Sequence, residues 1–102
     1  MLSLIEEKRA EVADLCRRKQ VRRLEIFGSA ARDDFDPSHS DLDFLVEFEP
    51  KSSLRGLDAY FGLKEELESL FGRPVDLVMP DAVRNPYVRA GIDRSRQLLY
   101  AA

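Results

Sequence analysis

The stretch from Ser40 to Val46 reads S-D-L-D-F-L-V, and the rest of the sequence can be placed around the strand it predicts. From Leu42 to Phe48 the side chains alternate in character, as in a β-strand that turns one face to a core. One face would carry Leu42, Phe44, Val46 and Phe48, and the other Asp41, Asp43, Leu45 and Glu47. The strand therefore predicts a sheet with an apolar face and a partly acidic face.

The remaining sequence predicts three helices and three further strands. Helices are expected over 2–19, over 53–71, and after a loop within 80–93, the last interrupted near Pro86; the other strands are expected over 22–27, 75–79 and 96–100. This order, α-β-β-α-β-α-β, predicts an α+β (α/β two-layer) domain, with a small mixed β-sheet and helices packed mainly on one face. At 102 residues, a single domain spanning 1–102 is the expectation.

Two helical stripes are expected to fill the core. The first comprises Ile5, Val12, Leu15 and Cys16, and the second Leu57, Phe61, Leu67, Leu70 and Phe71. Gly72 followed by Pro74 is a typical end signal for the second helix.

The net charge and the cysteine count of the chain indicate which partners and which cellular compartment to expect. The net charge is -3 and the pI is about 5.2, so direct nucleic-acid binding is not expected, since phosphate contacts need a basic surface. The single cysteine excludes an intrachain disulfide and fits the reducing cytoplasm, where we expect the protein. No signal peptide precedes the first helix, and no apolar run approaches the ~20 residues that a membrane helix needs.

Asp41 and Asp43 are the first candidate site residues. They lie two positions apart, so on a strand both carboxylates leave the same face. Two carboxylates this close repel each other unless a cation is present. Mg²⁺ is the expected cation, because it prefers carboxylate, phosphate and water oxygens. Two such ions about 3.5–4 Å apart would stabilise the attacking and leaving oxygens of a phosphoryl transfer.

Three other positions extend this constellation. Asp76 lies in P-V-D-L-V and would reach the same face if its strand pairs with 42–48, where it could help to hold metal and take the acceptor's proton. Gly28 and Ser29 end an apolar run, and backbone N–H groups at such a turn can bind phosphate. Arg32 would add positive charge. Each feature alone usually marks a solvated loop or face; their combination indicates a site.

As a set, three motifs resemble the nucleotidyltransferase superfamily that includes DNA polymerase β, and within it the minimal nucleotidyltransferases (MNT domains). They are F-G-S-A-A-R (27–32), S-D-L-D-F-L-V (40–46) and V-D-L-V (75–78), and the resemblance covers nearly the whole chain. It implies that Gly28 and Ser29 bind the triphosphate of ATP, that Asp41 and Asp43 hold Mg²⁺, and that Asp76 is the third catalytic carboxylate. Eleven residues separate Gly-Ser from D-x-D, one more than is usual in the family, and Asp33 replaces a usual glycine.

The resemblance also implies a biological role. Such domains are commonly antitoxins that transfer AMP from ATP to a tyrosine of a HEPN-domain ribonuclease toxin. The catalytic face uses most of this chain, so the acceptor surface is expected from a partner protein or from another copy of the chain. Two alternatives stay open: a non-catalytic antitoxin that occludes the toxin, and a small-molecule adenylyltransferase of the aminoglycoside type that works as a homodimer.

Overall fold

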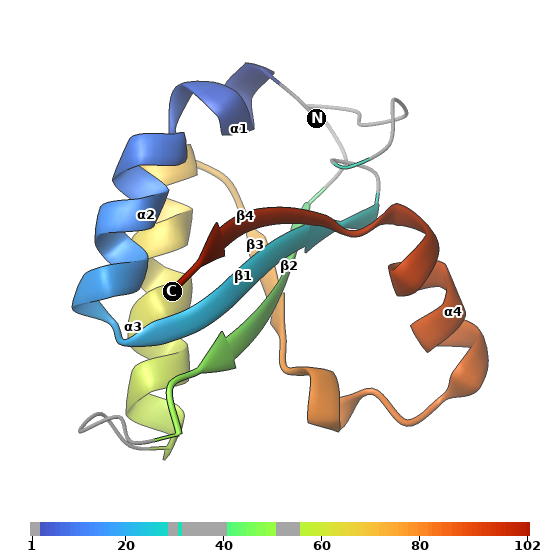
Figure 1. Ribbon diagram of the computed structural model, residues 1–102. Coiled ribbons are helices and arrows are strands. Elements are labelled where there is room, and N and C mark those ends of the chain that lie inside the picture. The colour runs from blue at the N-terminus through green and yellow to red at the C-terminus, as the bar shows by residue number, and fades with distance from the viewer. Residues whose placement is uncertain (1–2, 29–30, 32–40, 51–55) are drawn as a thin grey trace.

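A mixed four-stranded sheet forms the middle of this computed structural model (Figure 1). The structure describes residues 3–28, 31, 41–50 and 56–102. In chain order the elements are α1 (Ser3–Glu7), α2 (Arg9–Arg18), β1 (Val21–Phe27), β2 (Leu42–Phe48), α3 (Gly56–Phe71), β3 (Val75–Val78), the 3-10 helix η2 (Pro80–Ala82), α4 (Pro86–Ser95) and β4 (Gln97–Ala101). The predicted α+β class is confirmed, as is the predicted succession of strands along the chain, with a helix between the second and third strands and another between the third and fourth.

The strand order is β3-β2-β1-β4. β1 runs antiparallel to both β2 and β4, whereas β2 and β3 are parallel. A parallel pair cannot be joined by a tight turn, and α3 makes the crossover between these two strands. β2 therefore lies between β1 and β3, with the residues near its start beside both neighbours.

The core lies between one face of the sheet and the helices α2 and α3 (Figure 1). The predicted stripe of the first helix, Ile5, Val12, Leu15 and Cys16, is fully buried there. Burial raises the pKa of the Cys16 thiol to about 12, so this cysteine stays protonated and is a poor nucleophile. Glu66 of α3 pairs with Arg18 at 3.4 Å and with Lys19 at 3.5 Å, which joins the two helices at the surface.

The second predicted stripe was wrong at Phe61, whereas Leu67 and Phe71 are buried and Leu70 is partly buried; the side chain of Leu57 lies outside what the structure describes. Phe61 is 50% exposed, and Leu63 is fully buried in its place. Phe61 lies six positions before Leu67, a rotation of about 240° around a helix, so the two cannot share a stripe. Leu63 precedes Leu67 by four residues and lies on its face. Gly72 ends α3 as predicted, with a positive φ of 65°.

Two helix boundaries also differ from the prediction. The first helix is divided at Lys8 into α1 and α2. Pro86 does not interrupt the third helix but begins it, because the missing N–H of proline costs nothing in the first turn. Asn85 caps this start by accepting hydrogen bonds from the N–H groups of Tyr87 and Val88. α4 then continues to Ser95, and it stands apart from α2 and α3 (Figure 1).

Leu63→Ala is expected to lower the free energy of unfolding by about 2–5 kcal/mol, because it leaves a cavity in the core. Phe61→Ala, its neighbour on the same helix, should cost clearly less, since half of that ring already faces solvent. Urea unfolding followed by circular dichroism measures both variants. Equal losses would contradict the packing described for α3.

Candidate active site

The register of the sheet brings the predicted aspartates of two strands together. Phe27 of β1 is paired with Asp43 of β2, and Asp43 is in turn paired with Asp76 of β3. Paired residues of neighbouring strands lie about 4.8 Å apart and turn their side chains to the same face. Asp43 and Asp76 therefore share one face, as the alternation in their strands predicted.

Gly28, directly after β1, lies against the carboxylate of Asp43. Its φ is 73°, in the left-handed region that side chains rarely adopt. A Cβ added there would lie 3.3 Å from Asp43 Cγ and under 3.0 Å from Asp43 Oδ2. Glycine is thus required twice at this position, for the backbone conformation and for the space that Asp43 occupies.

Asp41 lies just before β2 and is exposed, as is Asp76, whereas Asp43 is half-buried. Ser29 and Arg32 lie outside the described residues, and their predicted contacts with nucleotide stay predictions. Gly28 and the carboxylates of Asp43 and Asp76 are thus the part of the predicted site that the structure brings together.

The described aspartates fit Mg²⁺ as open ligands rather than as a closed cage. Among residues 3–28, 31, 41–50 and 56–102, no group of three His, Cys, Asp or Glu side chains is close enough to hold a metal ion. Mg²⁺ does not require such a cage, because it usually binds through one or two carboxylates, water and substrate phosphates. Asp43 and Asp76 are in register, the first half-buried and the second exposed, and they offer that kind of hard-oxygen pair.

Two residues far along the chain hold the turn after β1, and the sequence analysis missed both. The N–H of Gly28 donates to Ser95 Oγ at 3.0 Å, and Gln97 Nε2 donates to the carbonyl of Ala31 at 3.0 Å. Within the turn, the N–H of Ala31 donates to the carbonyl of Gly28 at 3.1 Å. No local pattern marks Ser95 or Gln97, since their partners lie more than 60 residues earlier in the sequence.

A buried ion-pair network anchors the same part of the chain. Glu25 of β1 is only 4% exposed, although it lies on the same face of the sheet as Asp43. Its carboxylate pairs with Arg23 at 2.8 Å and with Arg96 at 3.2 Å, and Arg96 also reaches Asp93 at 3.1 Å. A buried carboxylate without such partners would be strongly destabilising. The network therefore ties the end of α4 to the sheet.

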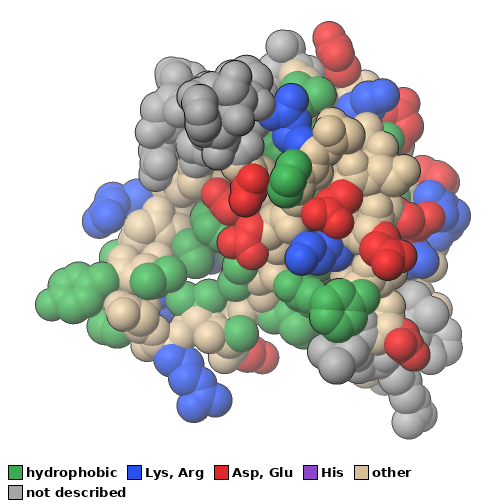
Figure 2. Space-filling model, turned by 180° about the vertical axis from the view of Figure 1, so that it is seen from behind, with side chains coloured by type: hydrophobic (Ala, Val, Ile, Leu, Met, Phe, Trp, Pro, Cys, Tyr) green, Lys and Arg blue, Asp and Glu red, His purple; other side chains and the backbone are tan. Residues whose placement is uncertain are grey.

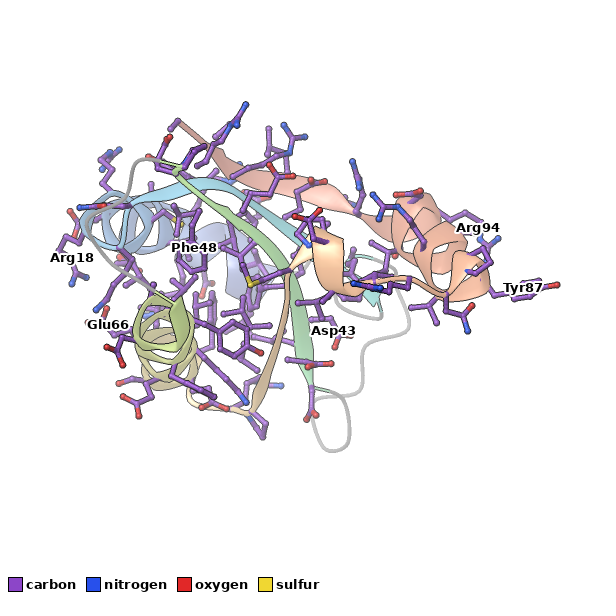
Figure 3. All side chains as sticks on the ribbon, turned by 90° about the horizontal axis from the view of Figure 1, so that it is seen from below. Arg18, Asp43, Phe48, Glu66, Tyr87 and Arg94 are labelled. Carbon is purple, nitrogen blue, oxygen red and sulfur yellow. The ribbon has the colours of Figure 1, made fainter. Side chains whose placement is uncertain are left out.

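The candidate site and the helices α2 and α3 lie on opposite sides of the sheet. In Figure 3, Asp43 lies on the side of the sheet where α4 projects with Tyr87 and Arg94, while Arg18 and Glu66 lie on the opposite side with α2 and α3. Figure 2 shows acidic side chains gathered near the middle of the face that it presents. No described helix is long and apolar enough to cross a membrane.

Comparison with known proteins gives consistent matches. The sequence profile of the nucleotidyltransferase domain family matches residues 9–99. A candidate protein adenylyltransferase of Methanocaldococcus jannaschii is 36% identical over 93 residues, which covers 82% of this chain and 90% of the relative. A solved structure described as a candidate minimal nucleotidyltransferase has a TM-score of 0.72 and 36% identity, and the match covers 90% of this chain and 89% of that one.

A more distant structure shares the fold. It belongs to a complex between a tri-AMPylated HEPN toxin of Shewanella oneidensis and an MNT antitoxin. It matches with a TM-score of 0.65 and 18% identity, covering 96% of this chain and 73% of that chain. At this identity the match supports the polymerase β-like fold alone.

Gly28→Ala is expected to reduce nucleotide transfer by at least about tenfold, because the new methyl group displaces the Asp43 carboxylate. Gly72→Ala is the matched control: its φ is also positive, but nothing lies within 4 Å of the added Cβ. Both variants should lose about 1–2 kcal/mol of stability from backbone strain. Transfer assays and urea unfolding separate the effects, and equal activity in the two variants would contradict the role given to Gly28.

Proposed function

Because this chain belongs to the nucleotidyltransferase domain family, we propose that it transfers AMP from ATP to a tyrosine of a HEPN-domain toxin and so acts as an antitoxin. The observation that carries the proposal is the pairing of Asp43 with Asp76 beside Gly28. Residues 1–102 would form one minimal nucleotidyltransferase domain, working in the cytoplasm with ATP.

A protein acceptor is supported by two observations. The relative from Methanocaldococcus jannaschii is a candidate protein adenylyltransferase, and the Shewanella oneidensis complex contains an AMPylated HEPN toxin. In this chain Asp41 and Asp76 are exposed, so a tyrosine on the surface of a folded partner could approach them. A second copy of the chain is the other source of acceptor surface.

The chemistry follows from the positions of the carboxylates. The tyrosine oxygen attacks the α-phosphorus of ATP, the bond from that phosphorus to the bridging oxygen breaks, and pyrophosphate leaves. Asp76 takes the proton of the tyrosine hydroxyl as general base. Gly28, Ser29 and Arg32 would contact the triphosphate. Because the N–H of Gly28 is donated to Ser95, Gly28 would contribute by letting the backbone approach the phosphates closely.

Mg²⁺ would be held, in two ions as the sequence predicts, by Asp41, Asp43 and Asp76, with each ion taking one or two of these carboxylates and completing its ligands with phosphate oxygens and water. Bound Mg²⁺ supplies neutralisation of the charge that develops on the phosphates during transfer. The carboxylates of these aspartates would supply the negative charge that attracts the cation. Asp43, paired on both sides and half-buried, is the best fixed of the three.

Asp43→Asn and Asp76→Asn should each lower transfer of α-labelled AMP to the co-encoded partner by about 100-fold or more. Asp81→Asn is the control, since this exposed aspartate lies in η2, outside the proposed site. Labelling is followed by gel and by the mass of the partner, and a chelator should stop it until Mg²⁺ is restored.

The alternatives predict different outcomes of the same assay. Absence of label with the wild-type chain, together with full neutralisation of the toxin by Asp41→Asn/Asp43→Asn, would favour the non-catalytic antitoxin. Label on an aminoglycoside without a protein acceptor would favour the small-molecule enzyme. Label on the chain itself would identify a second copy as the acceptor.

A further inference from the structure

The end of α4 and the start of β4 reach back to the turn that follows β1. Three consecutive residues make the contacts, and we call them the 95–97 segment: Ser95, Arg96 and Gln97. Ser95 and Gln97 bind the two ends of the turn, Gly28 and Ala31. The segment therefore fixes the turn at both ends.

The hydroxyl of Ser95 has a defined orientation. It is buried, with the residue only 8% exposed, and it donates to the carbonyl of Gly91 at 3.2 Å or of Ile92 at 3.4 Å. A serine near a helix end often bonds back to these carbonyls. Because its hydrogen is used there, Ser95 Oγ meets the N–H of Gly28 as an acceptor.

Arg96, which lies between Ser95 and Gln97 in the sequence, attaches the 95–97 segment to the sheet. Its guanidinium pairs with the buried Glu25 at 3.2 Å, and Glu25 lies in β1, the strand that ends at the turn. The turn and the segment that holds it are thus both attached to β1. Movement of Ser95 away from Gly28 would have to break this ion pair or bend the strand.

We propose that Ser95 and Gln97 are positioning residues for nucleotide binding, which hold Gly28 and Ala31 in place and so keep Gly28 against Asp43. They would act through Gly28 and Ala31 and not by contact with the nucleotide, since Ser95 Oγ and Gln97 Nε2 are bound to these two residues. The inference rests on the proposed role of this turn in binding ATP. It adds that residues from the end of the chain set the affinity for nucleotide.

Ser95→Ala removes the acceptor of the Gly28 N–H, and Gln97→Glu replaces the donor to Ala31 by a carboxylate of the same shape. Each variant should raise the Kd for ATP with Mg²⁺ by about tenfold, the effect of losing one hydrogen bond that orders a site. The rate at saturating ATP should change less than KM. Ser95→Thr keeps the hydroxyl and should retain most of the affinity.

The test uses the full chain and three measurements. Calorimetry with ATP and Mg²⁺ gives the Kd, hydrogen exchange by NMR reports on the Gly28 amide, and thermal unfolding confirms that each variant is folded at the assay temperature. Ser69→Ala is the control, since Ser69 is an exposed serine of α3 far from the turn. Faster exchange of the Gly28 amide with a higher Kd in Ser95→Ala is the expected result.

Three other results would overturn the inference in different ways. If the wild type binds ATP and both variants bind it equally well, the turn does not depend on the 95–97 segment for nucleotide binding, and the proposed function stands. If the wild type binds no ATP, the proposed function fails and this inference fails with it. A lower unfolding temperature with unchanged Kd would leave Ser95 a purely structural role and overturn the inference.

Discussion

The position of β2 between β1 and β3 is the constraint on which the site depends. Through it, Asp43 is paired with Phe27 on one side and with Asp76 on the other. A shift of one residue in either pairing would turn the carboxylates to opposite faces. The buried side chains of Leu42, Phe44 and Val46 oppose such a shift, because it would expose them to water.

The close approach of Gly28 to Asp43 follows from that register. Phe27 faces Asp43, so the residue after Phe27 must turn immediately beside the carboxylate. Only glycine combines the positive φ with the absence of a side chain that this turn needs. The glycine at position 28 is therefore required by the pairing of β1 with β2, in addition to any role in the chemistry of the site.

The opposite side of the turn is held by polar contacts from the end of the chain. Glu25, Arg96 and Ser95 form a series of contacts that runs from the middle of β1 to the N–H of Gly28. Helices α2 and α3 take no part in it, since they cover the other face of the sheet. One face thus provides most of the apolar core, and the other carries the charged and hydrogen-bonding groups of the site.

The sequence by itself determined the features that depend on local periodicity. Alternation placed Asp43 on the face opposite to Leu42 and Phe44, the Gly72 signal ended α3, and the spacing of Ile5, Val12 and Leu15 identified the first core stripe. Only the tertiary structure decided which strands are neighbours, and hence that Asp43 lies opposite Asp76 and that Glu25 is buried between Arg23 and Arg96. It also decided that Ser95 binds Gly28. The side-chain periodicity of helices and strands is local, so the sequence reveals it directly. Pairing between distant segments depends instead on packing and on the need to satisfy buried polar groups.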